Sequence, residues 1–196
     1  MYLINGQLRD DVTLETTLER LHQQLPRLLN APIDSDTVIE TAVQFAGQLQ
    51  ANAIELPLED EQRQGLIDFC QRSTLSTKLE RELGVQPRSL RRIDYQQARF
   101  ESSHPLGLVV HVTPGNAPLL AFCAVDESLL AGYVNWLRPS SSDEGLTARL
   151  LAALVQCDTS DTLADFIAVL PVTTAQIPQL CAHADGVSAW GGEQAL

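Results

Sequence analysis

A turn rich in proline, glycine and asparagine follows a short apolar run of the chain. The run covers residues 108–112, and the turn covers 113–118, Thr-Pro-Gly-Asn-Ala-Pro. Gly115 can take a positive φ and lets backbone approach a ligand. The helix that Ala117 and Pro118 open presents free N–H groups, which favour negative charge. Asn116 places an amide donor at this helix start, where it can either stabilise an oxyanion forming on a carbonyl group or simply cap the helix.

The elements around this turn form a strand–helix–strand unit. Apolar runs at 108–112 and 133–137 flank a helical stretch at 119–131. Continuous apolar runs of this length are typical of parallel strands covered on both faces, and the crossover between two such strands is right-handed. The turn therefore lies at the carboxyl end of the first strand, where open α/β sheets bind their ligands.

A second polar loop follows the run at 133–137. It begins with Arg138-Pro139-Ser140-Ser141, and Ser142 or Asp143 can cap the next helix. A guanidinium at this position can pair with phosphate through its planar fork. The alternative is an arginine at the end of a strand that points into solvent.

The same alternation continues to the end of the chain. Helical patterns at 143–154 and 174–181 alternate with apolar runs at 166–170 and 186–190. We therefore predict an α/β fold in which residues 101–196 form a Rossmann-like, nucleotide-binding half with a parallel sheet.

Residues 1–100 are predicted to be mostly helical and to pack on that sheet. A short strand or hairpin arm at 2–8 contains the turn signal Asn5-Gly6. Leucines at spacings of three and four residues then predict an amphipathic helix over 14–30.

Ser35 or Asp36 can cap a second helix, and a third helical stretch begins after Pro57. This third stretch continues to residue 83, with a break near Ser73 and Gly84 as its stop. The following segment, up to about residue 105, is predicted to be extended or loop-like, and the composition change near residue 100 marks the domain boundary.

Composition and charge exclude several classes of protein. The formal charge of −12 on 196 residues argues against a nucleic-acid or anionic-membrane surface. The N-terminus resembles no signal peptide, and no apolar run approaches the roughly 18 residues of a membrane-spanning helix. No cluster has the spacing of metal ligands, so we assign no metal. The four cysteines are far apart in the sequence, which predicts reduced thiols in a cytoplasmic protein: Cys70, Cys123, Cys157 and Cys181.

Several motifs together resemble the LuxC-type acyl-CoA reductases, a branch of the aldehyde dehydrogenase superfamily. They are the segment GLVVHVTPGNAP followed by LLAG and LRPSS, the upstream segments LERELG and HPLG, and the terminal AWGGE. The resemblance runs from about residue 79 to the end of the chain. It implies an aldehyde-dehydrogenase-like cofactor domain.

The resemblance also implies roles for individual residues. Asn116 matches the asparagine of the superfamily's oxyanion site and is the predicted catalytic residue. The predicted cofactor-binding residues lie on three loops: Thr113, Pro114, Gly115, Arg138, Ser140, Ser141, Gly191 and Gly192. His111 matches a histidine of the LuxC-type strand, which suggests either a role near the site or a hydrogen-bonded core histidine.

The loop after the second strand bears on the choice of cofactor. The superfamily motif at this loop is K-P-x-E, whose lysine and glutamate contact the adenosine ribose. Here Arg138 replaces the lysine and Ser141 replaces the glutamate. A serine cannot repel a ribose 2′-phosphate, and an arginine can bind one, so we expect NADP(H) to be preferred over NAD(H).

The resemblance places the nucleophilic cysteine of the family after the Gly191-Gly192 turn, in a separate catalytic domain. None of the four cysteines matches that position. We therefore expect this chain to be the amino-terminal, cofactor-binding portion of a fatty acyl-CoA reductase, a fragment or truncated product that is inactive alone.

Other interpretations remain open on the sequence. One is another superfamily enzyme, such as a CoA-acylating aldehyde dehydrogenase or a glutamyl-phosphate-type reductase. Another is a non-catalytic nucleotide-binding or assembly module. The resemblance implies a fatty acyl-CoA as the partner of the full-length enzyme, and a homo-oligomer.

Overall fold

The computed structural model describes residues 1–84, 89–117 and 119–190. The main sheet contains six strands, which are, in chain order, β1 (Tyr2–Ile4), β2 (Gln7–Arg9), β5 (Leu108–Val112), β6 (Val134–Arg138), β7 (Ile167–Val169) and β8 (Gly186–Ala189). Across the sheet their order is β2-β1-β7-β6-β5-β8. The strands β1 and β2 form an antiparallel edge.

The other four strands of the sheet are parallel. β5 lies between β6 and β8, and β7 pairs with the far side of β6. Numbered along the chain, these strands follow the order 3-2-1-4, which is that of a Rossmann half. All five residues of β5 are buried, as expected for a parallel strand covered on both faces. The predicted α/β class and parallel sheet are confirmed.

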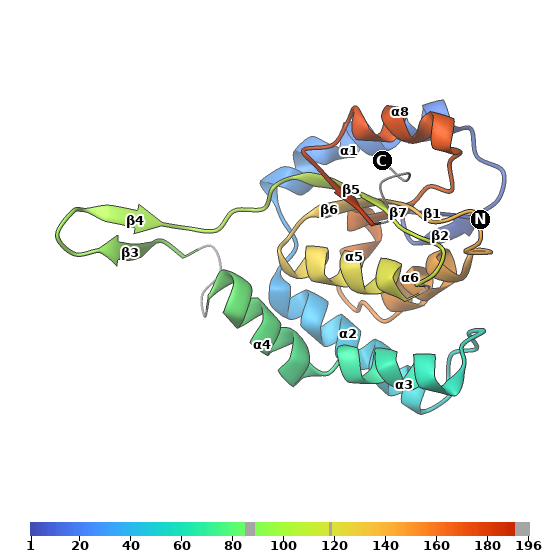
Figure 1. Ribbon diagram of the computed structural model, residues 1–196, viewed down its shortest axis with the longest axis horizontal. Helices are drawn as coiled ribbons and strands as arrows, with labels where there is room; N and C mark the ends of the chain where they lie inside the picture. Colours follow the sequence, from blue (N-terminus) through green and yellow to red (C-terminus); the bar gives the residue numbers. More distant parts are fainter. Residues whose placement is uncertain (85–88, 118, 191–196) are drawn as a thin grey trace.

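Helices cover both faces of the sheet (Figure 1). One face carries α1 (Leu14–Asn30) and α8 (Ile177–Cys181), and a short 3₁₀ turn, η1 (Thr174–Gln176), precedes α8. The opposite face carries α5 (Leu120–Leu130) and α6 (Leu146–Gln156), and α2 (Ser35–Gln50) packs against these two helices. Beyond α2 lie α3 (Asp60–Phe69) and α4 (Arg72–Leu83), and α7 (Leu163–Phe166) leads into β7.

The helices of the first hundred residues lie close to their expected positions, with two differences. The N-cap of α2 is Asp34, whose carboxylate accepts the Asp36 N–H at 3.2 Å, and not Ser35 or Asp36 as predicted. The long third stretch breaks at residues 70–71, earlier than the Ser73 expected from the sequence. Gly84 ends α4 with a φ of 87°, because glycine adopts this conformation without steric strain.

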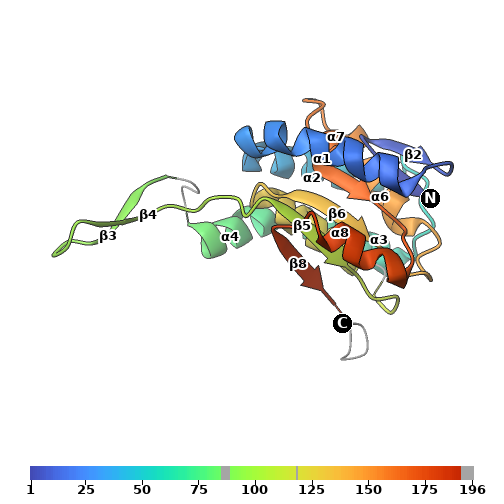
Figure 2. The same cartoon turned by 90° about the horizontal axis from the view of Figure 1, so that it is seen from above.

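The segment expected to be extended or loop-like contains an antiparallel hairpin. Its strands, β3 (Arg91–Asp94) and β4 (Arg99–Glu101), project away from the body of the molecule (Figures 1 and 2). Arg91 and Glu101 form an ion pair of 2.6 Å across the hairpin. The predicted boundary near residue 100 thus falls within β4.

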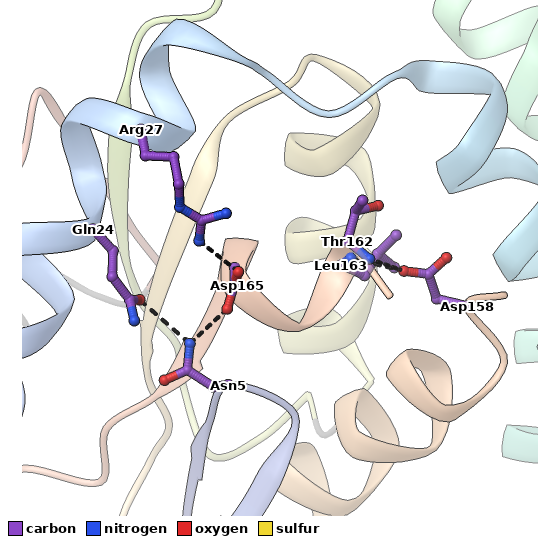
Figure 3. A network of polar contacts seen from close by, with 7 residues as sticks. All are labelled: Asn5, Gln24, Arg27, Asp158, Thr162, Leu163 and Asp165. Carbon is purple, nitrogen blue, oxygen red and sulfur yellow. Dashed lines mark hydrogen bonds and ion pairs between the residues drawn. The ribbon is translucent and has the colours of Figure 1, made fainter. Parts of the chain in front are cut away.

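A polar network joins the start of the chain to α1 and α7 (Figure 3). The Asn5 amide donates to the Asp165 carboxylate at 2.6 Å and to Gln24 at 3.3 Å. Arg27 forms an ion pair with the second oxygen of Asp165 at 2.6 Å. Asn5 and Gly6 have φ of 48° and 74°, as the predicted tight turn requires, so the network holds this hairpin against α1.

One hydrophobic core extends from the N-terminal helices to the strands of the second half. Between the helices, the Phe45 ring stacks on Phe122 with 5.3 Å between centroids, and Phe69 meets Phe122 edge-on at 6.5 Å. Each fully buried phenylalanine contributes about 1.5–3 kcal/mol of transfer free energy. Among the helices of the described residues, none combines the length and apolar character needed to cross a membrane.

This core also contains a carboxyl group. Asp126 of α5 is fully buried, and neither of its oxygens has a hydrogen-bond partner among the described residues. Burial, followed by the nearby charge of Glu127, raises the pKa of Asp126 to about 7. The folded protein therefore holds a proton on Asp126 at a pH where the unfolded chain has released it.

This shift predicts a pH-dependent stability. Because the pKa of Asp126 is higher in the folded state, its effect lowers the free energy of unfolding as pH rises from about 4 to about 7. Asp126→Asn should remove that loss and be more stable than wild type by a few kcal/mol at pH 8, measured by urea unfolding. Asp161→Asn, at an exposed position, is the control. If the free energy of unfolding depends on pH in the same way for wild type and Asp126→Asn, the carboxyl of Asp126 is not buried in its protonated form.

Candidate functional site

The loops after β5 and β6 leave the sheet side by side. Val112 and Arg138 are register partners at the carboxyl ends of these parallel strands. One residue further, the Thr113 N–H donates to the Arg138 carbonyl at 3.2 Å. The parallel pairing thus brings residues 25 positions apart in the sequence to one edge of the sheet.

A pocket of about 370 Å³ lies between these two loops and the start of α6. Thr113, Pro114 and Gly115 line it from the first loop, and Ser140 lines it from the second. Residues that the sequence analysis did not select complete the wall: Pro57, Ala117, Ala121, Ser142, Asp143, Glu144, Leu146 and Arg149.

Gly115 is required here by close packing. A Cβ atom on Gly115 would lie 2.7 Å from the Ser140 Oγ and even closer to the Ser142 Oγ. The two hydroxyls are themselves hydrogen-bonded at 3.0 Å. Gly115 does not use the positive φ that a glycine can adopt at this turn; other glycines of the described residues have a positive φ. Its lack of a side chain instead lets the two loops meet.

The start of α6 forms one wall of the pocket. Its N-cap is Gly145, with a φ of 81°, and not Ser142 or Asp143 as predicted. Asp143 nevertheless bonds the helix start, because its carboxylate accepts the Thr147 N–H at 3.2 Å and also the Thr147 hydroxyl. This charge-assisted bonding stabilises the first turn of the helix and fixes a carboxylate on the wall.

The remaining predicted residues lie around the pocket. Asn116 and Ser141 are exposed and do not belong to the described residues that line it. Arg138 is half-buried, and its Nε donates to the Val172 carbonyl at 3.3 Å, which directs the side chain toward the loop after β7. The predicted Gly191 and Gly192 lie outside the described residues.

The structure rejects the capping role for Asn116. Helix α5 begins at Leu120, later than the sequence predicted, and its N-cap is Leu119, with no side-chain cap bond. The exposed Asn116 amide therefore lies on the loop before the helix, at the carboxyl edge of the sheet.

His111 lies in the core beneath this edge. It is 3% exposed, and its Nε2 lies 3.0 Å from the Asn135 Oδ1. Because the Asn135 amide nitrogen donates to the Tyr133 carbonyl, its oxygen is the acceptor, so the His111 proton resides on Nε2. Burial lowers the pKa of His111, and the ring is neutral. The contact supports the core-histidine interpretation.

The cysteines differ from activated nucleophiles. All four carry free thiols. Burial, followed by the charge of Asp126, raises the pKa of Cys123 to about 12 and raises that of Cys70 as well. A thiol with a raised pKa carries little thiolate at neutral pH, so neither group is suited to attack a carbonyl carbon.

The fold of the described residues is that of aldehyde dehydrogenases. The fold is similar to that of an NAD-dependent aldehyde dehydrogenase from Sinorhizobium meliloti, with a TM-score of 0.69 and 15% identity over 96% of this chain and 44% of that chain. It is also similar to betaine aldehyde dehydrogenase from Staphylococcus aureus in complex with NAD⁺, with a TM-score of 0.63 and 14% identity over 96% and 42% of the two chains. Gamma-glutamyl phosphate reductase from Saccharomyces cerevisiae has a TM-score of 0.57 and 11% identity over 94% and 53%.

The family model for acyl-CoA reductase (LuxC) matches residues 15–196, and the chain belongs to that family. A curated relative, the long-chain acyl-protein thioester reductase of Vibrio harveyi, is 27% identical over 135 residues. That match covers 65% of this chain and 28% of the relative, so the chain spans well under half of that protein's length.

The close approach at Gly115 makes a prediction about stability. Gly115→Ala should lower the free energy of unfolding by about 1–3 kcal/mol, because the methyl group forces the Ser140 and Ser142 hydroxyls apart. Gly47→Ala is the matched control: it lies inside α2, where a Cβ meets no atom within 4 Å, and should stabilise the protein by about 0.5–1 kcal/mol. Equal effects of the two substitutions in urea unfolding would refute the packing argument.

Proposed function

We propose that this chain is the cofactor-binding portion of an NADPH-dependent acyl-CoA reductase that converts a fatty acyl-CoA to a fatty aldehyde. The observation that carries the proposal is the pocket at the carboxyl edge of β5 and β6. The pocket lies where open α/β sheets bind nucleotides. Its walls come from the loop after β5 and the loop after β6. Membership of the LuxC family supports the chemistry.

The residues of the pocket suit the adenosine end of a dinucleotide. The Ser140 and Ser142 hydroxyls can accept and donate hydrogen bonds to ribose hydroxyls, and the Asp143 carboxylate can accept them. The missing side chain at Gly115 lets the Ser140 and Ser142 hydroxyls lie against the first loop, so that both hydroxyls stand at this edge of the sheet. In the complete enzyme, bound NADPH would supply hydride to the reacting carbonyl carbon.

The remaining chemistry requires a cysteine thiolate, which we propose lies in a part of the enzyme beyond this chain. The thiolate attacks the acyl carbonyl carbon, the bond to sulfur of coenzyme A breaks, and an enzyme thioester forms with release of the CoA thiolate. Reduction of this thioester releases the aldehyde and regenerates the thiolate. Negative charge develops on the carbonyl oxygen in both steps, and we assign the Asn116 amide as the donor that stabilises it.

The charges on the pocket wall allow the cofactor preference to be tested. The positive charge of Arg149 favours binding of a ribose 2′-phosphate, whereas the negative charge of Glu144 disfavours it. The negative charge of Asp143 is partly compensated by the hydrogen bonds that it accepts from Thr147. In isothermal titration, NADPH should bind about tenfold more tightly than NADH. Arg149→Gln should remove this difference, and Glu144→Gln should enlarge it.

The possible results separate two questions. Equal affinity of wild type for the two cofactors would refute the NADPH preference and leave nucleotide binding in place. Absence of binding by either cofactor, in protein that is folded by circular dichroism, would refute the cofactor-binding function itself.

The role of Asn116 makes a second kinetic prediction. In the complete reductase, Asn116→Ala should lower kcat by about 10²–10³-fold with either an acyl-CoA or an acyl-protein thioester as substrate, because one oxyanion donor is lost. The affinity for the cofactor should change little, since Asn116 does not line the pocket. Asp161→Asn, at an exposed position outside the predicted site residues, is the control, and an unchanged kcat for Asn116→Ala would eliminate the proposed oxyanion role.

Comparison of the two substrates identifies the acyl donor. The Vibrio harveyi relative is named for acyl-protein thioesters, whereas the family model is named for acyl-CoA. We propose acyl-CoA for this protein, so kcat/KM should be higher for fatty acyl-CoA than for the same acyl group on a protein thiol. A higher kcat/KM for the acyl-protein thioester would identify that thioester as the substrate in place of acyl-CoA, and the proposed reductase chemistry would still hold.

A further inference from the structure

A pair of histidines joins α1 to the end of α8, on the face of the sheet opposite α5 and α6. His22 is an exposed residue of α1, and His183 lies two residues after the end of α8. The Nδ1 atoms of the two rings lie 3.3 Å apart, and the ring planes are tilted by 52°. The two residues are 161 positions apart in the sequence, so only the fold brings them together.

We propose that His22 and His183 form a binding site for a late first-row divalent cation such as Zn²⁺ or Ni²⁺. The two nitrogens of imidazoles bound to a tetrahedral ion at 2.0–2.1 Å lie about 3.3–3.4 Å apart. The observed Nδ1–Nδ1 distance of 3.3 Å matches this separation. When both rings carry their protons on Nε2, both Nδ1 lone pairs face the space between the rings, and a cation replaces the proton that they otherwise share.

The surroundings hold one of the two ligands in place. The His183 ring lies against the buried Trp136 of β6, with 5.6 Å between centroids, and the His183 N–H donates to the Leu180 carbonyl at 3.1 Å. His22 is carried by α1, which has 17 residues and is anchored in the core by its leucines. Two ligands on packed elements need little reorganisation to bind an ion, which favours affinity.

The chemistry of the two imidazoles defines the class of cation. Imidazole ligands suit Zn²⁺, Ni²⁺ and Cu²⁺, whereas Mg²⁺ and Ca²⁺ require oxygen ligands.

Such an ion would connect α1 to α8. Helix α8 leads from β7 to β8, the outer parallel strand beside β5. A metal bridge at His22 and His183 would therefore stabilise the covering layer on this face of the sheet, remote from the pocket between the β5 and β6 loops.

The site is tested by thermal unfolding of the complete protein. Bound metal is first removed by chelation, and Tm is then measured with Zn²⁺, Ni²⁺ or Mg²⁺ as the single added cation. Zn²⁺ or Ni²⁺ at about ten times the dissociation constant should raise Tm by roughly 3–6 °C, with one ion bound per chain in calorimetric titration. Mg²⁺ should have no effect. His22→Ala, which changes an exposed side chain, and His183→Ala should each abolish the shift.

Two control variants exclude other metal ligands. His104→Ala removes an exposed histidine outside the pair, and Cys181→Ser removes the half-buried thiol nearest His183 in the sequence; both should retain the full shift. The site is refuted if wild type shows no shift, if the shift persists in His22→Ala, or if Cys181→Ser abolishes it.

Discussion

The parallel pairing of β5 with β6 is the constraint on which the rest of the structure depends. Both strands are buried under helices on two faces, so their polar loops can leave only at the ends. Because the strands are parallel and Val112 is level with Arg138, the two loops emerge at the same edge and meet. The Thr113 N–H bond to the Arg138 carbonyl extends this pairing one residue beyond the strands and fixes the floor of the pocket.

Small residues and mixed charges shape that edge. The absence of a side chain at Gly115 lets the first loop contact the Ser140 and Ser142 hydroxyls. The walls combine the Asp143 and Glu144 carboxylates with the Arg149 guanidinium, so the site is polar without a single dominant sign of charge. Such a surface suits a ligand with several hydroxyl groups, and it makes recognition of an added phosphate depend on a few charged side chains.

Local sequence patterns were insufficient where contacts between distant segments decide the outcome. The β3–β4 hairpin was expected only as an extended or loop-like segment, because its strands are charged and lack a clear apolar alternation. Arg149 was not selected, since within its own helix it resembles any solvent-facing arginine, and only the fold brings it to the pocket. The N-caps of α2 and α6 differ by one to three residues from those expected, as several polar residues adjoin each helix start.

The sequence by itself determined the α/β class, the turn at 113–117, and the helices and strands from 106 onward except the short helix α7, because apolar periodicity and turn residues act over short distances. The sequence placed Phe166 in a strand, whereas it is the last residue of α7. It also determined the likeness to LuxC-type reductases. The tertiary structure alone decided that β1 and β2 form an edge of the sheet and that α5 begins after Leu119 without a side-chain cap from Asn116. It also decided that the Asp126 carboxyl is buried with no hydrogen-bond partner among the residues that the structure describes. These features arise from packing between segments far apart in the chain, which no local pattern encodes.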